Sequence, residues 1–228
     1  MIFILIILFV LVVLASFLLA FYSMKDFHTK PNPDFEYALF LVRSDNGLKV
    51  NALSAIFAKA AERDLLISLE RLFKGDKKAW VIYGPKKILL PYKEDLGLLE
   101  LEDYTDVDIN NIAIWEVAIK NVQDFKEKLP KLLENEQFWF QIILKLKGKD
   151  LHLIPAQLRF ILLSQDADRL KELTENTQKN FENLLPKLPK PFSKSQLFEF
   201  YKTRSLIKEN GREVKLKVEE VLNLGFFL

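Results

Sequence analysis

The chain has 228 residues, half of them hydrophobic, and its 33 Lys and Arg nearly balance its 31 Asp and Glu to give a formal charge of +2. This balance excludes the strong basic field that is typical of proteins that bind nucleic acid through overall charge. The sequence has no cysteine, which excludes disulfides and thiolate metal sites. At this length we expect one apolar span and one or two small domains.

The first 22 residues carry no charged side chain. The stretch from Ile2 through Leu11 to Tyr22 is long enough for a helix to cross a hydrocarbon core of about 30 Å. A secretory signal peptide would have a basic start, a shorter apolar stretch and a cleavage site of small residues, and none of these is present. The pattern predicts a transmembrane anchor over residues 1–24 that contacts the lipid bilayer through residues 2–22.

Basic residues follow this span and none precedes it, with Lys25 and Lys30 the first two. Because basic residues concentrate on the cytoplasmic side of a span, the pattern predicts a single-pass cell-membrane protein whose remaining residues are cytoplasmic. Pro31 and Pro33 predict an extended linker over residues 25–36.

Beyond the linker, strand and helix patterns alternate. Leu53, Ile56 and Phe57 recur at the spacing of one helical face. The order β-α-β-β-α-β is that of the ferredoxin-like split βαβ plan, so an α+β unit is expected over residues 37–108. Its predicted elements are a strand over 37–43, a helix over 48–64, strands over 66–73 and 78–85 joined by a hairpin at Gly75-Asp76, and an edge strand over 98–104.

The second half repeats this plan as a second ferredoxin-like α+β unit over residues 109–190. Its clearest strand covers 137–147, where Phe138, Phe140 and Ile142 alternate with polar residues. The other predicted elements are a strand over 112–120, a helix over 122–136 that Pro130 kinks or splits, a strand over 157–164, and a helix over 165–187.

A helical exit segment is expected over residues 191–228, with a short helix over 197–207. Val218, Val221 and Leu222 recur at helical spacing near its end. This pattern predicts a second short helix that packs back onto the domain.

The sequence shows no arrangement typical of a catalytic, metal or cofactor site. Neither His28 nor His152 has a second ligand at metal spacing. The acidic run over residues 100–108 lacks the alternating pattern of a calcium loop, and no phosphate-binding loop motif is present. We therefore expect a protein that is not an enzyme and has no cofactor.

Lysines cluster at residues 145–149 and again across 187–202, where aromatic residues are interleaved. Basic residues next to aromatic ones can bind single-stranded nucleic acid, although the near-neutral charge argues against direct binding. The candidate contacts to an anionic ligand are Lys145, Lys147, Lys149, Lys187, Lys190 and Lys194.

Several motifs, in order, resemble a family of bacterial membrane-anchored proteins linked to type IV secretion and conjugation. Residues 67–105 resemble its strand-hairpin-strand block, which leads into an acidic E-x-E-D-Y motif. Residues 134–148 resemble its strand beginning E-x-E-Q-x-W-x-Q-I, and residues 158–184 resemble its next strand and long helix. The ending at residues 216–228 is similar to the family's exit segment, although Gly225-Phe226 replaces its Leu-Phe-His.

In fuller members this region precedes a P-loop motor of the coupling-ATPase class. The sequence contains no such motor motif, so the resemblance implies a membrane-anchored scaffold that recruits a separate P-loop ATPase of a DNA-transfer apparatus. The alternative is a membrane-tethered module that binds nucleic acid. The sequence does not indicate an oligomeric state. In the scaffold interpretation the exit segment docks the partner, with candidate contacts at Val221, Leu224, Phe226, Phe227 and Leu228.

Overall fold

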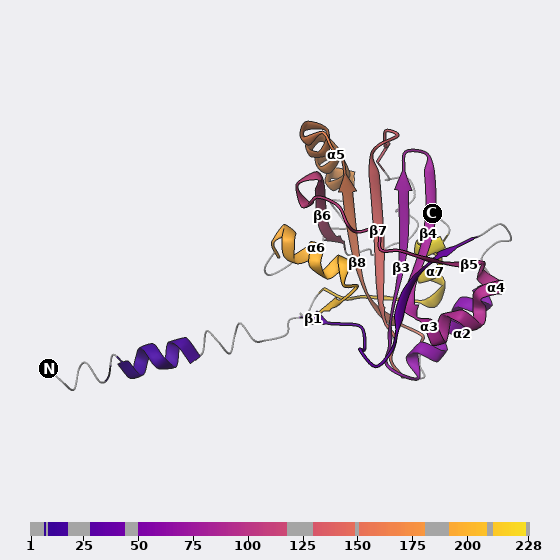
Figure 1. Ribbon diagram of the computed structural model, residues 1–228, viewed down its shortest axis with the longest axis horizontal. Helices are drawn as coiled ribbons and strands as arrows, with labels where there is room; N and C mark the ends of the chain where they lie inside the picture. The colour runs from indigo at the N-terminus through magenta and orange to yellow at the C-terminus, as the bar shows by residue number, and fades with distance from the viewer. Residues whose placement is uncertain are drawn as a thin grey trace.

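A large antiparallel sheet is the centre of the molecule (Figure 1). The computed structural model describes residues 7, 9–17, 28–43, 50–117, 130–148, 151–180, 192–208 and 212–226. The strands of the sheet are β2 (Tyr37–Val42), β3 (Leu66–Lys74), β4 (Lys77–Pro85), β5 (Leu98–Leu101), β6 (Ile112–Val117), β7 (Gln137–Lys145), β8 (Ile154–Leu163) and β10 (Val214–Leu216).

The strand order is β10-β8-β7-β3-β4-β2-β5, and β6 pairs with β8 beside β10. Every pair is antiparallel. β4 lies between β2 and β3, the two strands that α2 (Val50–Ala61) connects, which is a split βαβ arrangement. The α+β class is therefore confirmed, and β5 lies at the edge of the sheet, as predicted.

Pairing between β3 and β7 joins the two predicted units. The two strands pair along their whole length, from Leu66 opposite Lys145 to Lys74 opposite Gln137. Residues 37–108 and 109–190 therefore share one continuous sheet. As a result β3, β7 and β8 are central strands, and both of their faces are covered.

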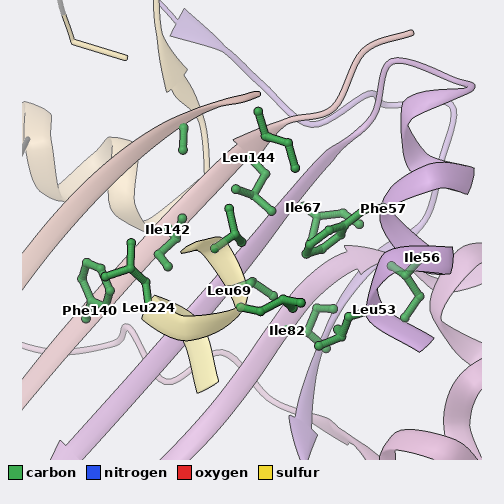
Figure 2. Packing of buried hydrophobic residues seen from close by; sticks show 14 of the residues in the cluster. Leu53, Ile56, Phe57, Ile67, Leu69, Ile82, Phe140, Ile142, Leu144 and Leu224 are labelled. Carbon is green, nitrogen blue, oxygen red and sulfur yellow. The ribbon is translucent and has the colours of Figure 1, made fainter. Parts of the chain in front are cut away.

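Helices cover one face of the sheet and enclose the main hydrophobic core. These helices are α2, α3 (Lys86–Leu89), α4 (Lys93–Leu96), α5 (Ala167–Asn180) and α7 (Val218–Phe226), with a 3-10 turn, η1 (Leu90–Tyr92), between α3 and α4. Alternation along the strands turns one row of apolar side chains toward these helices. Figure 2 shows Leu53, Ile56 and Phe57 of α2 and Leu224 of α7 packing with Ile67, Leu69, Ile82, Phe140, Ile142 and Leu144 of the sheet.

A thinner layer covers the other face. It contains the segment that crosses the sheet from β5 to β6, the 3-10 turn η2 (Ile109–Asn111), the helix α6 (Lys194–Lys202), and the short pair β1 (His28–Thr29) and β9 (Leu206–Ile207) (Figure 1). The predicted helix over 197–207 begins earlier and ends earlier in the structure. Its start is fixed by a capping box, in which Ser193 and Gln196 each accept a hydrogen bond from the other's backbone N–H.

Another helix prediction fails around Pro130. Residues 130–136 of the helix predicted over 122–136 are not helical in the structure, and residues 118–129 lie outside the described ranges. Proline lacks the N–H that a helix interior needs and restricts the residue before it, so it disfavours a helix that continues through Pro130.

The predicted transmembrane helix is wrong. The structure describes residue 7 and residues 9–17 of the expected span as helical. Across the described ranges, no helix is both long enough and apolar enough to cross a membrane. Leu11 is in this helix and is 58% exposed, whereas Ile2 and Tyr22 lie outside the described residues. The transmembrane anchor predicted over residues 1–24 and the single-pass membrane location are therefore corrected, whereas the lipid contact predicted for residues 2–22 stays a prediction.

Candidate functional site

Buried polar side chains lie in a row across the three central strands. Glu70 of β3 pairs with Gln141 of β7, which pairs with Arg159 of β8, so all three point to the same face of the sheet. Their exposed fractions are between 0% and 2%. We call this row and its partners the polar cluster: Ser68, Glu70, Asp103, Tyr104, Gln141, Gln157, Arg159, Tyr201 and Arg204.

Glu70 is the main acceptor in the polar cluster. Its Oε1 accepts hydrogen bonds from Ser68 Oγ at 3.0 Å, Gln141 Nε2 at 2.9 Å and Arg204 Nε at 3.1 Å. Its Oε2 accepts one from the Tyr104 hydroxyl at 2.5 Å. A buried carboxylate is tolerated when its charge is paired and its oxygens are hydrogen-bonded, and Glu70 meets both conditions.

Arg204 supplies the positive charge of the cluster. It lies just after α6 with a φ of +48°, a left-handed conformation that non-glycine residues rarely adopt. Its guanidinium pairs with Glu70 and with Asp103, whose Oδ2 is 2.5 Å from Nη1. Burial lowers the pKa of Arg204, but the charges of Glu70 and Asp103 raise it by more, so the pKa stays above its ordinary value. The guanidinium is therefore charged.

Two tyrosines complete the polar cluster: Tyr104 in the segment that crosses the sheet from β5 to β6, and Tyr201 in α6. The hydroxyls of Tyr104 and Tyr201 are 2.9 Å apart, and because Tyr104 donates to Glu70, Tyr201 donates to Tyr104. Burial raises the pKa of both hydroxyls, and the charge of Glu70 raises it further. Both side chains are therefore neutral donors.

Arg159 and Gln157 bind the main chain that follows α6. Arg159 donates to the carbonyls of Phe200 at 2.8 Å and Ser205 at 2.7 Å. Gln157 accepts from the Ile207 N–H at 2.9 Å and donates to the Ile207 carbonyl at 2.7 Å, as a neighbouring strand would. Burial lowers the pKa of Arg159 to about 10, although the charge of Glu116 acts in the opposite direction. These bonds fix the end of α6 and β9 to the sheet.

The polar cluster joins three distant parts of the chain, because its members come from the central strands, the crossing segment and the residues after α6. Asp103 is exposed and Tyr104 is partly buried, whereas the other side chains of the cluster are buried. Three surface pockets, at the β3–β4 turn, at the start of β8 and beside η2, are lined by other residues. The described chain also contains no group of three or more His, Asp or Glu placed to hold a metal ion. The chemistry of the polar cluster is that of a structural network.

The predicted lysine contacts do not form one surface. Lys145 and Lys147 are exposed at one end of β7, whereas Lys194 begins α6 close to Asp108, near the other end. A strand of that length spans roughly 26 Å. Lys149, Lys187 and Lys190 lie outside the described residues.

Two of the predicted docking residues in the exit segment belong to the core. Val221 and Leu224 of α7 have exposed fractions of 0% and pack in the main hydrophobic cluster. Figure 2 shows Leu224 in this cluster. While α7 is packed, these two side chains cannot contact a partner. The side chain of Phe226, and Phe227 and Leu228 entirely, lie outside the described part of the chain.

In the described part of the chain two buried arginines lie outside the polar cluster, Arg71 and Arg212, and Arg212 has an ion pair with the buried Glu116. Arg71 of β3 is on the helix-covered face, pairs with Phe140 of β7 and has an exposed fraction of 1%. Its Nε and Nη1 have no hydrogen-bond partner, and its guanidinium lies over the rings of Phe73 at 5.0 Å and Trp80 at 5.3 Å. Burial lowers its pKa to about 10. Arg71 thus keeps a charge in the core without the hydrogen bonds that Arg159 makes.

We expect Arg71→Met to raise the free energy of unfolding by about 1–4 kcal/mol, because it replaces a buried charge that has unsatisfied donors with an apolar side chain of similar length. Urea denaturation followed by circular dichroism measures the change. The matched control is Lys78→Met, which removes an exposed cation from the neighbouring strand and should change stability by no more than about 0.5 kcal/mol. A loss of stability in Arg71→Met would show that its ring contacts outweigh its desolvation.

Comparison with known proteins adds no relative to this description. No protein-family model matches the chain, and no curated protein is significantly similar to it. The fold and the polar cluster define an α+β protein built on one antiparallel sheet.

Proposed function

We propose that this chain is a non-enzymatic scaffold that docks a partner protein. The proposal follows the resemblance to proteins linked to type IV secretion, and the proposed partner is a P-loop ATPase of a DNA-transfer apparatus. The observation that carries it is the position of the motif residues. Asp103 and Tyr104 of the E-x-E-D-Y motif and Gln141 of the second motif are all members of the polar cluster.

These motif residues therefore have a structural role in the fold. Tyr104 and Gln141 bind the carboxylate of Glu70, and Asp103 binds Arg204. The motif residues that carry the resemblance therefore hold the central strands, the crossing segment and the residues after α6 together. Catalytic acids and bases have to reach a substrate, usually from a cleft. The groups of the polar cluster are hydrogen-bonded to each other instead, which favours a platform over a reaction centre.

Affinity purification of the full chain from the cells that produce it tests the proposal. We expect a P-loop ATPase to be recovered, and the tagged ATPase to recover this chain in the reciprocal experiment. A matched control is the Lys77→Glu/Lys78→Glu variant, because it changes two exposed side chains at the start of β4 and should retain the partner. Failure to recover any P-loop ATPase in both directions would overturn the proposal.

A further inference from the structure

An open pocket of about 310 Å³ lies where β7 ends and β8 begins. Figure 1 shows that this end of β8 is opposite the end that leads to α5. Its volume is at the lower limit for ligand pockets, enough for one or two side chains. Four apolar residues and two lysines line the pocket: Leu151, Leu153, Ile154, Pro155, Lys145 and Lys147.

Lysines lie on both sides of the start of β8, from the end of β7 and from β10. Leu144 pairs with Ala156, so Lys145 lies one position further, beside Pro155, and Lys215 of β10 pairs with Pro155 from the other side. The three positions share one face of the sheet, which places Lys145 and Lys215 about 10 Å apart.

The positive charge at the pocket is only partly neutralised. Lys145 has an ion pair with Glu213 at 3.7 Å, and its side chain is still 47% exposed. Lys147 and Lys215 are exposed as well. An exposed ion pair at that distance contributes little stability, so an incoming carboxylate can replace Glu213 at small cost.

Apolar surface lies beside these charges. Leu153 is 52% exposed beside the lysines and lines the pocket with Leu151 and Ile154. The described residues that line the pocket include no aromatic ring on which a nucleic-acid base could stack. The combination of lysines with an aliphatic pocket fits a peptide better than a nucleic acid.

We propose that this pocket binds an acidic segment of the partner protein, with one bulky apolar side chain in the pocket and flanking carboxylates on Lys145, Lys147 and Lys215. This inference rests on the proposed docking function and identifies the surface of this chain that contacts the partner. The charges orient and select the segment, and the aliphatic walls exclude sequences that are acidic throughout.

Fluorescence anisotropy of the full chain with a labelled synthetic peptide of alternating glutamate and leucine tests this surface. We expect Lys145→Glu/Lys147→Glu to weaken binding by about tenfold or more, since two attractions become repulsions. Leu153→Ser should weaken it as well, whereas Lys77→Glu/Lys78→Glu, the same charge change at a distant hairpin, should not. A peptide of alternating lysine and leucine should not bind.

Equal binding by the Lys145→Glu/Lys147→Glu variant and the unmodified chain would overturn the proposal. Tighter binding of a single-stranded oligothymidine that displaces the acidic peptide would overturn it in favour of nucleic acid. The purification experiment separates the two claims. If the ATPase is recovered with both the unmodified chain and the variant, the docking function stands and this surface is wrong, whereas recovery with neither overturns the function itself.

Discussion

Replacing Glu70 by alanine is expected to lower the free energy of unfolding by about 3–5 kcal/mol, because it leaves the buried Arg204 without its main counter-charge. The change also removes the acceptor that Ser68, Gln141 and Tyr104 share. Such a loss is a large part of the stability of an ordinary domain. Equilibrium unfolding in urea measures it, and a loss below about 1 kcal/mol would show that the cluster reorganises around water.

Two further variants separate charge from shape at this position. Glu70→Gln keeps the size of the side chain and an acceptor oxygen but removes the charge, so its loss of stability should be smaller than that of Glu70→Ala. Glu70→Met combined with Arg204→Met removes both charges, and it should cost less than the sum of the two single changes. Asp103 does not reverse this expectation, because its half-exposed carboxylate can be hydrated when Arg204 is absent.

Replacing Arg159 by methionine is expected to lower stability by about 2–4 kcal/mol, because the carbonyls of Phe200 and Ser205 lose their buried donors. The opposite sign is expected for the same change at Arg71, although burial lowers the pKa of both arginines to about 10. The difference lies in the hydrogen bonds, which Arg159 makes with the residues after α6.

Hydrogen exchange shows where the Arg159→Met variant loosens. The amide of Ile207 should exchange faster relative to the amides of β3 and β4, because β9 is bound to the sheet beside Arg159. Arg159→Lys is the control, since it keeps one charged donor group and should give an intermediate effect. A uniform increase of exchange across the whole sheet would contradict a local role for Arg159.

Strand periodicity predicted the sheet well because it reports burial directly. The alternation of Phe138, Phe140 and Ile142 marks the strand and the face that meets the core. The Gly75-Asp76 turn was equally clear, and Gly75 does adopt a positive φ of 53°. The β3–β7 pairing was not predictable, because nothing in either strand specifies a partner so distant in sequence.

The polar cluster could not be predicted from the sequence for a related reason. Gln141 alternates with apolar residues, and such a pattern is typical of a strand with one face in water. The additional signal is that Ser68-x-Glu70 and Gln157-x-Arg159 place charged residues on the same face of two other long strands. Only the strand order shows that the charges meet, and only the position of α6 shows that they are buried.

The short β1–β9 pair determines how a pulling force on the N-terminal part of the chain would enter the molecule. His28 and Thr29 pair with Ile207 and Leu206, and they precede β2 in the chain. Tension from that side would therefore load the two-residue pair first, and then Gln157 through its bonds to Ile207. The β1–β9 pair would therefore separate before tension reaches β2 and the large sheet.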